Sequence, residues 1–155
     1  MRIGILAVGR LGRAPEAELA ADYVERATAA GRSIALGPVE LIEIDARKPG
    51  KAGEGEALAA RLQAGDHLIC CDEHGRARSS RAFAEHLGAL RDRGVRRLVF
   101  MIGGADGLDP ELLSRASETL AFGPQTWPHA LARAMLAEQV YRAIAILAGS
   151  PYHRD

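Results

Sequence analysis

The sequence predicts an α/β fold, a mostly parallel sheet with helices on both faces, in one domain of residues 1–155. Two observations lead to this prediction. Short apolar runs alternate along the chain with stretches of helical pattern. One run, Leu98 to Ile102, is apolar throughout and is followed at once by Gly103 and Gly104, which is typical of a central strand buried on both faces. With 155 residues, 48% of them hydrophobic, the chain can bury a core of its own.

The first half of the chain is expected to supply three strands and two helices. Apolar or alternating runs predict strands at 2–8, 38–44 and 66–72. An alanine-rich stretch closed by Gly31 predicts a helix at 16–30, and a shorter one is expected at 54–63. The polar segments 45–53 and 73–78 are expected to be loops, because both are rich in charged residues and glycine.

The second half is expected to repeat this alternation. Ser79 or Ser80 can cap a helix that runs to about residue 93, before the strand at 98–102. Asp109 and Pro110 suit the cap and first position of a short helix, and a strand at 119–122 follows. Pro128 can open a last helix that ends near residue 148.

The last helix carries more apolar residues than one buried stripe requires. They are Leu131, Met135, Leu136, Val140, Tyr141, Ile144, Ile146 and Leu147. Arg133, Glu138 and Arg142 are expected on its surface, with Glu138 and Arg142 spaced for a salt bridge. A second covering surface is therefore expected, and a two-fold dimer is the commonest one.

Composition narrows the function classes. Twenty basic and twenty acidic residues cancel, so the overall charge gives no argument for nucleic-acid binding. No apolar run is long enough for a membrane span or a secretory signal, so a cytoplasmic location without membrane contact is expected. Cys70 and Cys71 are adjacent within an apolar run, and we expect buried, reduced thiols there.

Three segments should meet at the carboxyl edge of a parallel sheet: Cys71 and Asp72, the loop at Gly103, and residues 122–127. None contains a Walker lysine motif, a metal-ligand spacing or a nucleophile elbow. Gly9 and Gly12 lack the third glycine of a dinucleotide fingerprint, which argues against a Rossmann oxidoreductase. A glycine-lined, partly apolar site for an adenosine-like ligand remains.

Several motifs together resemble the bacterial large-subunit rRNA pseudouridine N3-methyltransferases, small enzymes of the SPOUT class. The likeness covers nearly the whole chain, including the opening strand and Leu41-Ile-Glu-Ile. Its most specific parts are Ile102-Gly-Gly-Ala-Asp-Gly-Leu, Thr126-Trp-Pro-His-Ala-Leu-Ala-Arg, Glu138-Gln-Val-Tyr-Arg-Ala and Pro151-Tyr-His-Arg-Asp.

This resemblance implies a trefoil knot in the carboxyl-terminal part, with S-adenosylmethionine bound by the knot loops. The positions that match the cofactor-binding ones are Cys71, Gly103, Phe122, Gly123, Pro124, Gln125, Thr126 and Trp127. The family usually has a larger apolar residue in place of Cys71. It also has a loop richer in serine and leucine where this chain has Gly123-Pro-Gln.

The resemblance also implies a homodimer in which the tail of one subunit completes the site of the other. Its substrate would be 23S rRNA in the assembled ribosome, held by arginines around one cleft: Arg10, Arg13, Arg142 and Arg154. Tyr152 in the tail offers a stacking ring. The alternative is a non-catalytic dimeric module that binds rRNA or the ribosome.

Methyl transfer to a ring nitrogen needs alignment and loss of the N3 proton, and it requires no metal. His129 and His153 are candidates to accept the proton, and Arg142 and Arg154 to stabilise the imidate. Simpler roles stay open: His129 as a helix cap, Arg142 in a salt bridge, and Tyr152 packed over a dimer seam.

Overall fold

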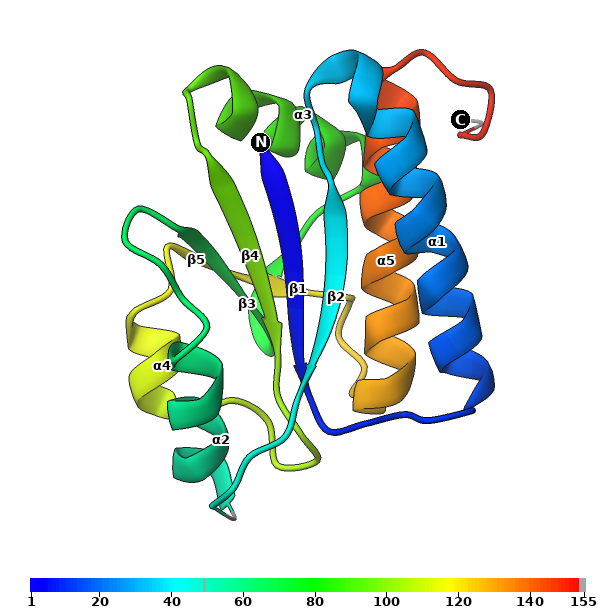
Figure 1. Cartoon of the computed structure of the whole chain (residues 1–155). Helices are drawn as coiled ribbons and strands as arrows, with labels where there is room; N and C mark the ends of the chain where they lie inside the picture. The colour runs from blue at the N-terminus through cyan, green and yellow to red at the C-terminus, as the bar shows by residue number, and fades with distance from the viewer. Residues whose placement is uncertain (49, 154–155) are drawn as a thin grey trace.

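The computed structural model describes residues 1–48 and 50–153, and these form a five-stranded, all-parallel sheet in the order β2-β1-β4-β3-β5 (Figure 1). The strands are β1 (Arg2–Val8), β2 (Val39–Ile44), β3 (His67–Ala77), β4 (Arg97–Ile102) and β5 (Glu118–Ala121). The helices are α1 (Pro15–Gly31), the 3₁₀ helix η1 (Arg32–Ile34), α2 (Gly50–Ala59), α3 (Ser80–Asp92), α4 (Pro110–Ser114) and α5 (His129–Leu147). The α/β fold with a parallel sheet is confirmed.

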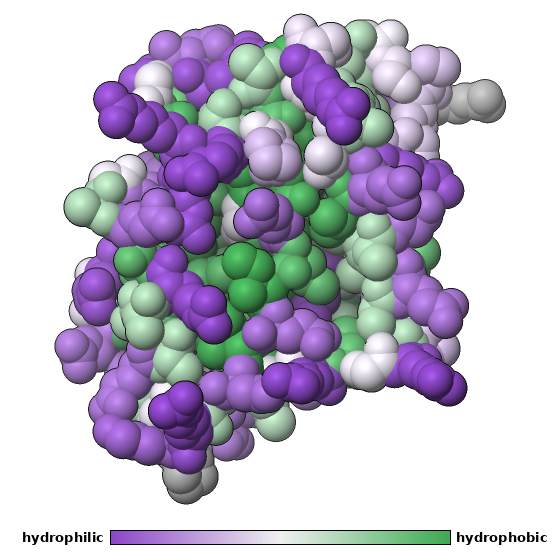
Figure 2. Space-filling view, viewed as in Figure 1, coloured by the Kyte–Doolittle hydropathy of each residue, from purple (hydrophilic) through white to green (hydrophobic). Residues whose placement is uncertain are grey.

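Helices cover both faces of the sheet, so the core has two parts. Helices α1, α3 and α5 enclose the larger apolar cluster, and α2 and α4 enclose the smaller one. The central strand β4 contributes side chains to both clusters: Phe100 faces the larger cluster, whereas Val99 and Met101 face the smaller one. Figure 2 shows apolar side chains in the middle of the face seen in Figure 1, framed by polar ones. No helix among the described residues has the length and apolarity of a bilayer span.

Strand β1, strand β4 and the caps of two helices match the prediction. The Ser79 hydroxyl accepts a hydrogen bond from the Ala82 N–H at 3.2 Å at the start of α3. Likewise, an Asp109 carboxylate oxygen accepts from the Glu111 N–H at 2.8 Å at the start of α4. Local capping chemistry therefore determined where these two helices begin.

Helix α2 corrects the prediction, because it spans Gly50–Ala59 rather than 54–63 and takes up part of the expected loop 45–53. Gly53 and Gly55 lie inside it and are buried. A Cβ on Gly53 would come within 2.4 Å of the Lys48 carbonyl oxygen, and one on Gly55 within 2.8 Å of the Asp109 Cβ. Close packing thus outweighs the poor helix propensity of glycine.

Strand β3 is the second correction. It continues to Ala77, so most of the expected loop 73–78 is assigned to the strand, and Arg76 and Ala77 pair with Leu120 and Ala121 of β5. Its register shifts between Cys71 and Arg76, and a Cβ on Gly75 would lie 2.7 Å from the Leu120 backbone. The polar composition suggested a loop, but a bulge lets this segment pass closely along β5.

Helix α5 follows the edge strand β5 and lies beside α1, with α3 as its other helical neighbour (Figure 1). Its expected apolar circumference is largely explained within one chain, since α1, α3 and the sheet bury Leu136, Val140 and Ile144 completely. The trefoil knot remains a prediction.

Arg133 is buried rather than on the surface, which corrects the expectation for α5. Its side chain is 0% exposed and donates to the carbonyl oxygens of Val8 and of Gly9, the latter at 2.9 Å. It also lies 3.2 Å from a Glu43 carboxylate oxygen, which accepts a hydrogen bond from the Leu11 N–H. Burial lowers the pKa of Arg133, and Glu43 counteracts this effect. One guanidinium therefore joins α5 to the carboxyl ends of β1 and β2.

The loop after β4 is closed by backbone contact. A Cβ on Gly103 would lie 2.5 Å from the carbonyl carbon of Gly107, and Gly107 itself has φ +80°. The Gly107 N–H donates to the Gly104 carbonyl at 3.1 Å. The glycine at 103 is thus needed for the close approach of two chain segments, and the one at 107 for its backbone angle.

We predict that Arg133→Met lowers the free energy of unfolding by about 3 kcal/mol, because Glu43 and two carbonyls lose a buried partner. Equilibrium denaturation measures this. Arg26→Met is the matched control, since Arg26 pairs with Asp22 at 2.8 Å while both side chains are about half exposed. It should cost less than about 0.5 kcal/mol. Equal losses in the two variants would contradict the anchoring role of Arg133.

Gly103→Ala is expected to destabilise the fold by about 2 kcal/mol, because the added methyl group meets backbone that cannot rotate away. Gly4→Ala in β1 serves as control, since a Cβ there finds its nearest neighbour, the Arg97 guanidinium, at 3.7 Å. Thermal unfolding of both variants compares them. A Tm for Gly103→Ala at or above that of Gly4→Ala would refute the prediction.

Candidate functional site

Three adjacent strands bring the predicted cofactor-binding segments to one edge of the sheet. Cys70 pairs with Met101 of β4, and Cys71 pairs with Leu120 of β5. Because all these strands are parallel, the loops that begin at Gly103 and Phe122 leave the sheet on either side of Cys71. This edge is where ligands bind in open α/β sheets.

The segment 122–127 forms a largely exposed loop fixed by side-chain hydrogen bonds. The Trp127 indole N–H donates to the Phe122 carbonyl at 3.2 Å, and the Thr126 hydroxyl donates to a Glu73 carboxylate oxygen at 2.7 Å. Gly123 has φ +101°. Within the described residues, the peptide N–H groups of Gly123, Gln125, Thr126 and Trp127 donate no hydrogen bond to the protein, and Pro124 has none to donate. They are therefore available to a ligand.

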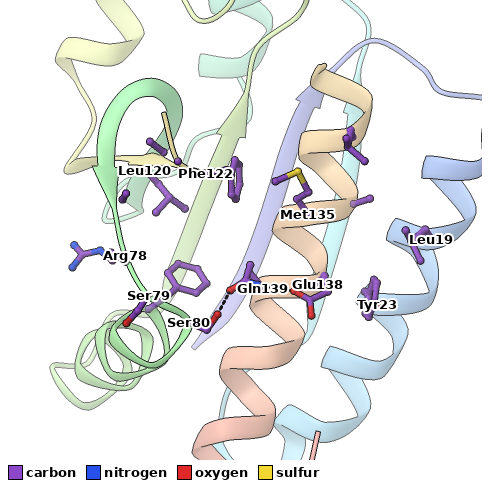
Figure 3. A pocket seen from close by; sticks show the side chains of 16 residues that line it. Leu19, Tyr23, Arg78, Ser79, Ser80, Leu120, Phe122, Met135, Glu138 and Gln139 are labelled. Atoms are coloured by element: carbon purple, nitrogen blue, oxygen red, sulfur yellow. Dashed lines mark hydrogen bonds between the residues drawn. The ribbon is translucent and has the colours of Figure 1, made fainter. Parts of the chain in front are cut away.

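A groove of about 560 Å³ begins beside this loop and runs between α5, the start of α3 and α1 (Figure 3). Phe122 and Gly123 line one part, and Met135 and Glu138 of α5 line another. Leu19 of α1 also lines it and is 46% exposed, the greatest exposure among the large apolar side chains of the described residues. The groove is thus an open, mainly apolar surface next to the loop.

The two cysteines are poor nucleophiles at neutral pH. Burial raises the pKa of Cys70 to about 12, and the nearby Asp72 adds to the rise. Burial also raises the pKa of Cys71, with smaller effects from Cys70 and Asp72. Both thiols are free, as expected, although Cys71 is only half-buried. A protonated thiol does not attack carbon readily, so the geometry gives no support to covalent catalysis by cysteine.

A polar cluster lies on the second half of α5, from its middle residue Glu138 onward. One oxygen of Glu138 accepts hydrogen bonds from Arg142 and, at 3.0 Å, from the Tyr152 hydroxyl. The Glu138–Arg142 salt bridge expected from their spacing is present, and its hydrogen bonds raise the pKa of Arg142. Arg142 also donates to His153 Nδ1 at 3.2 Å, and because a guanidinium can only donate, Nδ1 is unprotonated there.

Aromatic packing attaches the tail to its own chain. The Tyr152 ring lies 4.6 Å from the Tyr141 ring between centroids, and the Arg142 guanidinium lies 4.8 Å from the Tyr152 centroid. The Tyr152 and Tyr23 hydroxyl oxygens also lie 3.4 Å apart, and since the Tyr152 proton is directed at Glu138, Tyr23 can donate in this contact. Burial, followed by hydrogen bonds to Tyr23 and Glu138, raises the pKa of Tyr152, so its hydroxyl stays protonated. Tyr152 is thus fixed against α1 and α5.

The structure does not bring all the candidate catalytic residues together within one chain. His129 is the first residue of α5, next to the loop 122–127, and α5 has no side-chain hydrogen bond at its cap. Arg142 follows thirteen residues later, roughly 20 Å along a helix, and it contacts His153 and Tyr152 there. Arg154 lies outside the described residues.

Nothing in the sequence indicated Glu54, a polar residue that lies beside the loop 103–107. Glu54 of α2 has a carboxylate oxygen that is buried and without a hydrogen-bond partner among the described residues. A Cβ on Gly104 would lie 2.9 Å from that carboxylate, so the missing side chain leaves space for it. No motif marks Glu54, because it reaches the loop from an element of the opposite half of the chain.

Comparisons with known proteins identify the family of this chain. The family model described as "Predicted SPOUT methyltransferase" matches residues 1–153. The chain is 71% identical to "Ribosomal RNA large subunit methyltransferase H" of Caulobacter sp. (strain K31) and of Phenylobacterium zucineum (strain HLK1), over the full length of both chains. It is 48% identical to the protein of that name from Dinoroseobacter shibae, over 99% of each chain. The chain therefore belongs to the SPOUT methyltransferase family.

Proposed function

We propose that this protein, acting as a single domain, transfers a methyl group from S-adenosylmethionine to N3 of a pseudouridine in 23S rRNA of the assembled ribosome. The observation that carries the proposal is the meeting of three strand ends and the loop 122–127 at one edge of the sheet. The name shared by the relatives supports the choice of ribosomal RNA as substrate.

The residues at this edge fit an adenosine-containing methyl donor. The peptide N–H groups of Gly123, Gln125, Thr126 and Trp127 are unpaired among the described residues, and Cys71 and Phe122 supply apolar surface beside them. We assign cofactor binding to Cys71, Gly103 and the loop from Phe122 to Trp127. When bound, the donor supplies a methyl group on a positively charged sulfur. The protein is left to orient the acceptor base and to move its proton.

The acceptor nitrogen carries a proton that has to leave during transfer. His129 begins α5 directly after the cofactor loop, so its imidazole is a candidate to accept this proton. His153 is the other candidate, and it can accept the proton only after Arg142 releases its Nδ1 lone pair. Arg142 or Arg154 would stabilise the negative charge that develops on the deprotonated base.

A homodimer in which each site uses residues of both chains accounts for the distance between His129 and the tail cluster, which consists of Arg142, Tyr152 and His153. The tail cluster and His129 lie near opposite ends of α5, and α5 leaves Met135 and Leu131 open toward an apolar groove. A second copy packed on this groove would cover it and would carry its own Tyr152 and His153 to the cofactor loop. Each site then uses two chains.

RNA binding would depend on local positive charge, since the net charge of the chain is zero. Arg10 and Arg13 lie in the exposed loop after β1, near the carboxyl edge of the sheet. Arg10 pairs with Asp45 at 2.8 Å, but both side chains are largely exposed, so such a pair can exchange for a phosphate contact at little cost.

Calorimetry and a methylation assay test this function. We expect the purified protein to bind S-adenosylmethionine and to transfer tritiated methyl to ribosomes from cells that lack the protein. Mass spectrometry of the rRNA should locate the methyl group on N3 of a pseudouridine. Ribosome binding without any uptake of S-adenosylmethionine, by calorimetry or by a rise in Tm, would instead indicate a non-catalytic rRNA-binding module.

Mixed dimers test whether the site is shared between subunits. We expect deletion of residues 151–155 to abolish methylation and to leave cofactor binding and dimerisation intact. Gly123→Val should abolish cofactor binding, because its backbone angle and the Gln125 side chain 3.1 Å away exclude a larger residue. Co-expression of the two inactive chains with different tags should restore activity, since one intact composite site forms. An inactive mixed dimer, or full activity after the deletion, would contradict the shared site.

A further inference from the structure

Two imidazoles and a carboxylate converge at the amino edge of the sheet, opposite the cofactor loops. His67 is the first residue of β3, His86 lies in α3, and Glu118 is the first residue of β5. The Nε2 atoms of His67 and His86 lie 2.9 and 2.6 Å from the same Glu118 oxygen, Oε1. The three potential ligand atoms all lie within 4.8 Å of one another.

The cluster is half-buried and its carboxylate is ionised. The side chains of His67, His86 and Glu118 are 23%, 18% and 20% exposed, so solvent reaches one side only. Arg78 donates to the other Glu118 oxygen, Oε2, at 2.7 Å. Burial alone would raise the pKa of Glu118, but hydrogen bonds from His67, His86 and Arg78 outweigh this effect and lower the pKa to about 2. Oε1 is therefore an anionic acceptor with two imidazoles fixed against it.

We propose that His67, His86 and Glu118 form a binding site for one divalent transition metal ion, Zn²⁺ by preference. Two imidazole nitrogens and one carboxylate oxygen are three of the four ligands of a tetrahedral zinc site, and water from the exposed side supplies the fourth. Mg²⁺ and Ca²⁺ fit poorly, because they require oxygen ligands and higher coordination numbers.

Metal binding requires only small movements of the side chains. Ligand atoms around tetrahedral zinc are roughly 3.3 Å apart, so each imidazole has to retreat from Oε1 by about half an ångström. The same Nε2 atoms then bind the metal through their lone pairs, and the ring protons move to Nδ1. Arg78 can keep its contact with Oε2 and orient the carboxylate, as hydrogen-bond donors to ligating carboxylates do at known sites.

Such an ion would have a structural effect. Strand β5 is only four residues long and lies at the edge of the sheet, paired with β3 alone among the described strands. The ion would connect its first residue to β3 and to α3. This inference does not rest on the proposed methyl transfer, because the cluster lies at the edge of the sheet away from Cys71 and Gly103.

Isothermal titration of the full chain with ZnCl₂, in a buffer that does not chelate zinc and without a histidine tag, tests the site. We expect one ion per chain and a rise in Tm of about 5 to 10 °C at a hundredfold excess over Kd. His67→Gln and His86→Gln should each weaken binding by more than about 100-fold. His74→Ala is the control, because that imidazole is 84% exposed and lies 3.3 Å from Asp72. It should leave binding unchanged.

Absence of zinc uptake, or uptake that survives both glutamine variants, would overturn the proposal. X-ray absorption of the zinc-loaded wild-type protein gives a second test that requires no variant to fold. Two imidazoles and oxygen ligands around the ion are expected, whereas sulfur ligands or a single imidazole would exclude this site. Methylation by the two glutamine variants should remain at the wild-type level, so failure of the metal site and failure of the proposed methyl transfer can be told apart.

Discussion

The buried guanidinium of Arg133 is the contact on which the geometry of the candidate site depends. It fixes the first turns of α5 against the carbonyl groups of Val8 and Gly9 and against Glu43. The loop from Phe122 to Trp127 therefore joins two fixed points, the end of β5 and the start of α5. A loop held at both ends can present unpaired peptide groups without collapsing onto the sheet. If the Arg133 side chain lay on the surface instead, the start of α5 would not be attached to β1 and β2.

Much of the fold could be predicted because its signals are local. The apolar run of β4 and the caps Ser79 and Asp109 depend on neighbouring residues alone. The two incorrect predictions, the bounds of α2 and the end of β3, depend instead on contacts between residues far apart in the sequence. Helix α2 contains Gly55 where the Asp109 side chain packs against it, and β3 continues past Gly75 where the Leu120 backbone lies beside it. Such contacts join residues that pattern analysis treats as independent, so composition alone suggested loops in both places.

The candidate site could likewise be predicted only in part from the sequence. Strand ends and the family likeness indicated Cys71, Gly103 and the loop 122–127, and the parallel sheet brings these segments to one edge. The buried environment of Arg133 and the convergence of His67 on Glu118 could not be foreseen, since their partners are 90 and 51 residues away in the sequence. Nor could the sequence show that the tail folds back along its own α5, where Tyr152 contacts Glu138 and Tyr141.

The glycines that touch backbone also determine where this protein can be redesigned. A Cβ at position 75 or position 103 would collide with backbone, so libraries that vary these positions would consist mainly of destabilised chains. Gly12, in the loop after β1, has no atom within 4 Å of a Cβ, although its φ of +59° restricts the choice to residues that tolerate this angle, such as asparagine. Attempts to graft new RNA preferences onto this scaffold should therefore begin at that loop and leave the crowded turns untouched.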